Sequence, residues 1–188
     1  SNLDMKSLNT NTRIGASFSL TNRLKRLLWN FVYFLLFRFS PKPFHSWRIF
    51  ILRIFGAKIG KGVHVYGGVK IWAPWNLIIG DYTGIGNGVN LYSQGLITIG
   101  KNVVISQGSH ICTGTHDYND LGFKLITKQI IIGSNVWIAA EVFVHPGVEI
   151  EDGCIIGARS VVTTNLPAWK ICSGFPCIPL KERKFQTI

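Results

Sequence analysis

The feature of this sequence that most constrains its fold is an aliphatic residue that returns every six positions between Ile59 and about Pro167. Glycine or another small residue usually stands beside it, and Ile-Gly pairs at 59, 79 and 99 recur every twenty residues. The aliphatic series runs Ile59, Val65, Ile71 and Leu77; then Ile79, Ile85, Leu91 and Ile97; then Ile99, Ile105 and Ile111; and, after a break, Ile132, Ile138, Val144, Ile150, Ile156 and Val162.

A period of six does not match the 3.6 of a helix and fits a short strand followed by a turn. Three such units make a triangular coil, in which each aliphatic residue points inward and stacks on its equivalent in the next coil. We predict about five coils and a prism roughly 24 Å tall. An ordinary β-sandwich with regular turns is the alternative, but sandwich turns do not keep phase this strictly.

Three segments carry a family resemblance: IGKNV at 99–103, IGSNVWI at 132–138 and IGARSVVT at 156–163. They resemble the hexapeptide-repeat acyltransferases, and the similarity covers roughly residues 47–183. Within that family the sequence is most similar to the colanic acid O-acetyltransferases, with the maltose and galactoside O-acetyltransferases as more distant relatives. The resemblance implies an all-β, left-handed parallel β-helix, an exception to the usual right-handed crossover.

The resemblance also implies how such a protein works. It implies a homotrimer with an active site in each groove between subunits. It implies direct transfer of an acetyl group from acetyl-CoA to a hydroxyl of a saccharide, without an acyl-enzyme and with no metal required. The pathway would be exopolysaccharide or capsule biosynthesis.

The 188 residues are expected to fall into three parts. Residues 1–58 form an N-terminal arm and two aromatic, basic helices, residues 59–167 the β-helix, and residues 168–188 a C-terminal tail. The six-residue period stops at 117–129, where we expect a protruding loop. An insertion at a corner of a repeat protein usually builds a binding face.

The N-terminal part also carries most of the charge. Ten basic residues and one acid precede Gly60, out of a net charge of +11. Such asymmetry indicates an anionic partner. No nucleic-acid-binding motif accompanies the charge.

Two helices are predicted here, one capped by Asn22 and continuing through Arg38, the other from Phe44 to Phe55. The first is apolar nearly all round, which is typical of a helix buried in protein or lipid, but it is too short to span a bilayer. Two interpretations stay open. The helices pack on the β-helix or between subunits, or residues 22–55 anchor the protein peripherally on an anionic membrane surface.

Among the five histidines, His116 is the expected catalytic residue. It lies where a coil opens into the long loop, and its place matches the catalytic histidine of the family that the sequence resembles. A neutral imidazole can take a proton from a sugar hydroxyl as that oxygen attacks a thioester. Asp117 either orients His116 or the acceptor, or caps the loop.

The resemblance assigns the acetyl-CoA contacts. Ala140 matches a backbone N–H donor to the thioester carbonyl, which would stabilise an oxyanion. Ala158 matches a position beside the pantetheine arm, and Thr163 and Thr164 match contacts near the adenine. Lys181 matches a basic contact to phosphate, and Arg183 and Lys184 beside it would remain available for the same pairing.

The acceptor site is predicted from the coil before His116, where Asn90, Tyr92, Ser93 and Gln94 offer polar contacts. No acidic residue falls there, unlike in the sugar acetyltransferases. Trp137 either stacks on a sugar ring or CoA, or fills a corner of the prism.

Two other functions use the same features. A γ-type carbonic anhydrase binds zinc through three histidines, for which His110, His116 and His145 are the candidates, although the first two are spaced six apart rather than five. A non-enzymatic, membrane-associated scaffold is the other alternative. The four cysteines form no Cys-x-x-Cys pair, which favours reduced thiols in a cytoplasmic protein, held at the inner face of the membrane if the helices bind it.

Overall fold

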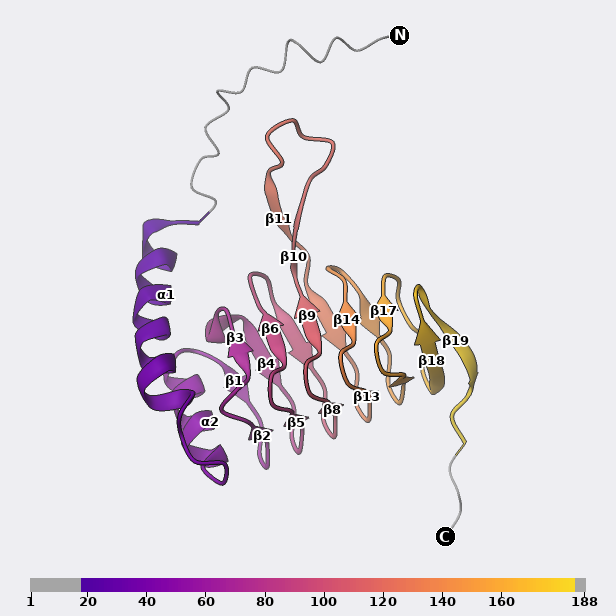
Figure 1. The fold of residues 1–188 in the computed structure, drawn as a ribbon, viewed down its shortest axis with the longest axis horizontal. Coiled ribbons are helices and arrows are strands. Elements are labelled where there is room, and N and C mark those ends of the chain that lie inside the picture. Colours follow the sequence, from indigo (N-terminus) through magenta and orange to yellow (C-terminus); the bar gives the residue numbers. More distant parts are fainter. Residues whose placement is uncertain (1–17, 185–188) are drawn as a thin grey trace.

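The structure, a computed structural model, describes residues 18–184. They form a prism of stacked coils, with helices at one end and a hairpin that projects from one edge (Figure 1). Residues 1–17, most of the expected N-terminal arm, and residues 185–188 lie outside the described part.

Three sheets form the sides of the prism, and consecutive coils pair in parallel within each. Sheet A contains β1 (Lys58–Ile59), β4 (Leu77–Ile79), β7 (Ile97–Ile99), β12 (Ile130–Ile132) and β15 (Glu149–Ile150). Sheet B contains β2 (His64–Val65), β5 (Gly84–Ile85), β8 (Val104–Ile105), β13 (Trp137–Ile138), β16 (Ile155–Ile156), β18 (Lys170–Gly174) and the antiparallel β19 (Cys177–Glu182). Sheet C contains β3 (Lys70–Ile71), β6 (Asn90–Tyr92), β9 (His110–Cys112), β14 (Phe143–Val144) and β17 (Val161–Val162).

The aliphatic residues that recur every six positions form the core of the prism. Ile79 pairs with Ile59 below it and with Ile99 above it, so equivalent positions stack from coil to coil. Every residue of the predicted series is buried except Ile59, which lies in the first coil and is half-buried. The predicted parallel β-helix is therefore confirmed.

The glycines beside these residues allow the coils to approach closely. A Cβ on Gly80 would lie 2.6 Å from the carbonyl carbon of Gly100, and one on Gly100 would lie 2.6 Å from that of Gly133. Real Cβ atoms do not come so close to backbone. The corner therefore requires glycine for space, since none of these three residues has a positive φ.

Helices close the N-terminal end of the prism. They are α1 (Leu20–Val32), a π-helical turn η2 (Tyr33–Phe37) and α2 (His45–Ile54), and a short 3-10 turn, η3 (Pro74–Asn76), follows β3. The predicted start at Asn22 is wrong. The hydroxyl of Ser19 accepts a hydrogen bond from the N–H of Asn22 at 3.2 Å, so Ser19 is the N-cap and the helix begins three residues earlier.

Side chains of these helices bind the backbone of the first coil, whose edge carbonyls have no strand beneath them. An uncovered edge would leave unpaired carbonyls and invite other strands. Trp29 Nε1 donates to Ile71 O (2.8 Å), Arg48 Nε to Val65 O (2.6 Å) and Arg53 Nη2 to Ile59 O (2.7 Å). Each of the three sheets thus receives a donor at its first strand, and the helices serve as the terminal cap that a solenoid needs.

The C-terminal end is closed by strands rather than a loose tail. β18 pairs in parallel with β16, and β19 folds back on β18. Residues 170–182 therefore continue sheet B beyond the predicted boundary at 167. This extra strand gives sheet B six parallel strands, one more than the predicted number of coils.

The predicted protrusion is a β-hairpin. β10 (Gly114–His116) pairs in antiparallel fashion with β11 (Leu125–Thr127), and the hairpin leaves sheet C directly after β9 (Figure 1). It begins at Gly114, three residues before the predicted loop. None of the helices within residues 18–184 is long and apolar enough to cross a bilayer.

Candidate active site

His116 ends the outgoing strand of the hairpin, opposite Leu125. Its side chain is exposed, and its Nδ1 lies 2.5 Å from the carbonyl oxygen of Phe123. A carbonyl can only accept a hydrogen bond, so Nδ1 carries the proton and Nε2 presents a lone pair. Folding of the hairpin therefore fixes both the ring and the tautomer of His116, which leaves Nε2 available as a base.

Asp117 does not perform this orienting. Its Oδ1 accepts from the N–H of Asn119 at 3.0 Å, and its own N–H donates to Lys124 O at 2.9 Å. The structure shows the loop cap predicted for Asp117, and its role toward the acceptor stays a prediction. The residue that orients His116 is Phe123, through its backbone, and this was not predicted because a carbonyl has no sequence signature.

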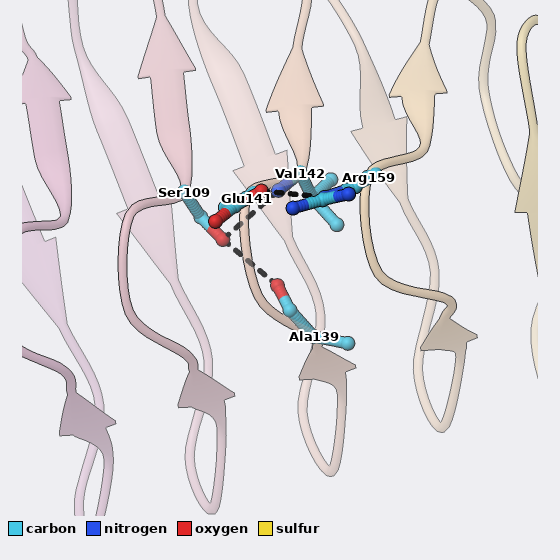
Figure 2. A network of polar contacts seen from close by, with 5 residues as sticks. All are labelled: Ser109, Ala139, Glu141, Val142 and Arg159. Carbon is cyan, nitrogen blue, oxygen red and sulfur yellow. Dashed lines mark hydrogen bonds and ion pairs between the residues drawn. The ribbon is translucent and has the colours of Figure 1, made fainter.

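The corner between sheets B and C carries the positions that match the acetyl-CoA contacts. Figure 2 shows how it is held: Ser109 Oγ donates to Ala139 O at 2.8 Å and accepts from the N–H of Val142 at 3.2 Å. Beside it, Glu141 and Arg159 form an exposed ion pair at 2.7 Å (Figure 2). An ion pair so exposed contributes little stability. The buried hydroxyl therefore does more than the ion pair to hold this corner rigid.

Ala140 and Ala158 lie in this corner, one coil apart. The carbonyl of Ala140 accepts from the N–H of Arg159 at 2.9 Å. Neither the N–H of Ala140 nor that of Ala158 has a hydrogen-bond partner within residues 18–184. Two unpaired backbone donors at one corner, on residues that carry only methyl side chains, fit an extended amide-containing ligand lying along the prism.

The remaining predicted donor contacts lie elsewhere. Thr163 and Thr164 follow β17 at the same edge of sheet C as the hairpin follows β9, two strands or roughly 10 Å away. Both are exposed. Lys181 is exposed on β19, opposite Ile171 in sheet B.

Arg183 does not remain available for phosphate. Its Nη1 donates to Asn135 O at 2.7 Å and to Gly153 O at 2.9 Å, which fastens the C-terminal strand to a corner. Lys184 is exposed.

Asn90 and Tyr92 line a cavity of about 260 Å³ between α1 and sheet C. Arg26, Lys70 and Trp72 are also in its lining. The Arg26 guanidinium lies 4.0 Å from the Trp72 ring centroid, and its Nε is buried with no partner in the described part of the chain. Lys70 was not predicted, although it precedes Asn90 by one coil in the same register.

Ser93 and Gln94 differ in whether their polar atoms are available to a substrate. Ser93 is buried, and its hydroxyl is used by both the N–H and the carbonyl of Ala73, at 3.0 and 2.9 Å. It therefore has no surface for a substrate. Gln94 Nε2 donates to the Tyr92 hydroxyl at 2.8 Å, and its buried Oε1 has no partner in residues 18–184.

Trp137 lies on sheet B, away from the hairpin and the cavity. It is 47% exposed, and its Nε1 donates to Ser106 Oγ at 3.0 Å. It is the first residue of the two-residue strand β13, and the Ser106 hydroxyl that it contacts follows β8. Both roles predicted for the ring, stacking on a ligand and filling a corner, stay predictions.

The histidines proposed for zinc do not gather in one chain. His110 and His145 flank Phe143 on sheet C, with ring centroids 5.0 and 5.1 Å from it, whereas His116 lies on the hairpin. Burial and the positive charge of Lys70 lower the pKa of His110. Within residues 18–184, no three His, Cys, Asp or Glu side chains lie close enough to hold a metal ion.

Comparisons of this chain with known proteins indicate one family. The model described as "Bacterial transferase hexapeptide (six repeats)" matches residues 129–164. The chain is 48% identical over 162 residues to the "Putative colanic acid biosynthesis acetyltransferase WcaF" of Escherichia coli strain K12, covering 86% of this chain and 89% of that protein.

Solved structures agree. A galactoside acetyltransferase in complex with coenzyme A superposes with a TM-score of 0.82 at 25% identity, covering 90% of this chain and 86% of the other. A maltose O-acetyltransferase from Clostridium difficile 630 gives 0.76 at 25% identity, covering 89% and 90%. The chain belongs to the hexapeptide-repeat acetyltransferases.

Proposed function

We propose that this protein transfers an acetyl group from acetyl-CoA to a hydroxyl of a saccharide, in the biosynthesis of an exopolysaccharide or capsule. The observation that carries the proposal is His116, whose Nδ1 is engaged by Phe123 O so that Nε2 is available to accept a proton. The relatives support the donor and the acceptor class: one solved structure holds coenzyme A, and one relative is named for colanic acid biosynthesis. Because the donor is an intracellular metabolite, the reaction belongs on the cytoplasmic side.

The chemistry follows from these groups. His116 Nε2 takes the proton of the acceptor hydroxyl while that oxygen attacks the thioester carbonyl carbon. The tetrahedral oxyanion accepts a hydrogen bond from the N–H of Ala140. Collapse breaks the C–S bond, and the imidazolium returns its proton to the departing CoA thiolate. The products are the acetyl ester and free CoA.

Direct transfer is favoured because the cysteines are poor nucleophiles. Burial raises the pKa of the thiol of Cys112, which also donates to Gly114 O at 3.3 Å. Burial likewise raises the pKa of Cys172 to about 12. A thiol acts as a nucleophile through its thiolate, so no cysteine here is prepared to form an acyl-enzyme.

The working unit is a homotrimer with its sites between subunits. In one chain, Ala140 precedes β14 and the hairpin of His116 follows β9, so the two lie at opposite edges of sheet C. About five residues of extended chain separate those edges, or roughly 16 Å. An oxyanion donor and a base must both reach one carbonyl group. A neighbouring subunit would supply the missing half.

The cavity at Asn90 and Tyr92 is the proposed acceptor subsite. Trp72 and Tyr92 supply aromatic rings for a sugar, and Asn90 supplies an amide. Arg26 and Lys70 are the charged residues in its lining, and no carboxylate accompanies them. We therefore favour an acceptor with a negative charge, such as a uronic acid or a sugar phosphate.

The test follows release of free CoA from acetyl-CoA with a panel of neutral and acidic oligosaccharides. We expect acceptor-dependent release, lost by 10²-fold or more in His116→Ala. The matched control is His64→Ala, an exposed histidine on sheet B, which should keep wild-type activity. Lys70→Gln should raise KM for an acidic acceptor with little change in kcat. Binding of acetyl-CoA without any acceptor-dependent release by the wild type, or equal activity in His116→Ala, would overturn the assignment.

A further inference from the structure

The helices that cap the prism have an outer surface that the proposed activity does not explain. We define the apolar face as the exposed apolar side chains of α1, η2 and α2 between Leu20 and Ile54. A helix on the surface of a water-soluble protein normally turns its polar side outward. Here the outward side is the apolar one.

The orientation of α1 is fixed by Trp29, which is fully buried and bonded to Ile71 O. The opposite side of the helix therefore points away from the prism. It presents Leu20, Leu24, Leu27 and Phe31, which recur at three- and four-residue intervals and are all more than half exposed. Helical positions three and four apart lie on one side, so these residues form one stripe.

The stripe continues onto α2. Trp47 Nε1 donates to Leu36 O at 3.0 Å, and an apolar cavity of about 350 Å³ lies between η2 and α2 beside it. The ring of Trp47 lies 6.0 Å from that of Phe50, which is exposed, as is Ile54 one turn further on. Both helices lie at the same end of the prism (Figure 1), and both expose apolar side chains there.

The charges around this surface have one sign. No Asp or Glu occurs between residues 18 and 80. Arg23, Arg38 and Lys42 are exposed on or between the two helices. A second copy of the same face would bring these cations together, so self-association through it is disfavoured. Anionic lipid headgroups, with acyl chains beneath them, complement both the cations and the apolar stripe.

We propose that the apolar face docks on the surface of an anionic lipid bilayer, with α1 lying in the plane of the interface. Thirteen residues of helix span roughly 20 Å, enough to lie flat on a bilayer and too little to cross it. The inference goes beyond acetyl transfer and does not depend on it. Docking would place the prism axis toward the membrane normal and hold the protein near lipid-linked saccharides.

The experiment measures flotation of the full chain with vesicles of phosphatidylethanolamine and phosphatidylglycerol, and with vesicles of phosphatidylcholine alone. The test variant is Leu24→Gln with Leu27→Gln, at positions 68% and 71% exposed. The control is Ile178→Gln with Leu180→Gln, at 53% and 61% exposed. The control residues lie on β19 at the far end of the prism (Figure 1). Glutamine is a good helix former, so α1 should keep its structure.

We expect wild type and control to float with the anionic vesicles, and the test variant to lose roughly tenfold or more in partition. Binding to the anionic vesicles should weaken in high salt and be much lower on phosphatidylcholine. Oligomeric state, measured by light scattering, should be the same for all three proteins. Equal flotation of test and control variants would overturn the proposal. So would a change in oligomeric state confined to the test variant, because the face would then be a subunit contact.

Discussion

Activity in mixed trimers tests whether the site is shared between chains. We would coexpress two inactive proteins with different affinity tags and purify the trimers that carry both. One is His116→Ala, which lacks the base. The other is Ala158→Trp, which places a large side chain over the corner of the unpaired N–H groups. Ala158 is exposed, so the indole should block a ligand there without disturbing the core.

The expected activity of the mixed trimers follows from the placement of the hairpin and the corner at opposite edges of sheet C. Suppose that each site takes its hairpin from one chain and its corner from the next. The Ala158→Trp chain still has an intact hairpin, and the His116→Ala chain still has an intact corner. A site in a mixed trimer is therefore intact when these two parts meet. Every closed cyclic trimer that contains both chains has one such site, which is about a third of its sites. Release of CoA at about a third of the wild-type rate per site is the expected result. If both groups belonged to one chain, every site would carry a defect, and the absence of restored activity would refute the shared site.

Three further outcomes follow from the geometry. Gly100→Ala should cost about 1–3 kcal/mol of unfolding free energy in urea, because its Cβ would meet backbone at 2.6 Å. Gly84→Ala, where nothing lies within 4 Å of the new Cβ, should change stability little; equal effects would contradict the stacking argument. Arg48→Met should cost about 3 kcal/mol, because the buried guanidinium donates to the carbonyls of Val65, Pro41 and Lys42, and the exposed Arg23→Met is its control. Burial raises the pKa of Cys172 from 9.0 in the unfolded chain to about 12 in the folded protein. The contribution of this thiol to the free energy of unfolding is therefore complete below pH 9 and is lost as pH rises toward 12. Thermal melts should show stability falling over that window, and Cys172→Ala should flatten the fall.

The repeat was predictable because a single period determines three properties at once. Ile79, Ile85 and Leu91 must face inward, must stack on their equivalents one coil away, and must each be followed by a corner. The structure at the two ends of the prism is harder to predict from the sequence, because the six-residue period stops there. β18 contains Cys172 in the buried position, and the next strand, β19, pairs with it in antiparallel fashion and so does not continue the series.

The site was predictable only where a side chain carries the chemistry. His116 stands at the predicted point of departure from the coil. The group that orients it is the carbonyl of Phe123, whose position depends on how the hairpin closes. Ser93 was predicted as a contact because it is polar and in the right coil. Its hydroxyl instead bonds to the backbone of Ala73 one coil below, because most buried polar groups in a protein are hydrogen-bonded.

The two sides of the N-terminal helices have separate roles, and this decides how membrane docking can be tested. Deleting α1 and α2 would remove the outer stripe, but it would also remove Trp29, Arg48 and Arg53 from the edge of the first coil. Carbonyls of all three sheets would lose their donors, and buried residues such as Val65 would meet water. Loss of membrane binding in such a truncated protein would therefore not distinguish a missing anchor from an unfolded end. Substitutions at Leu24 and Leu27 leave every one of those capping bonds in place, so only they separate the outer surface from the cap.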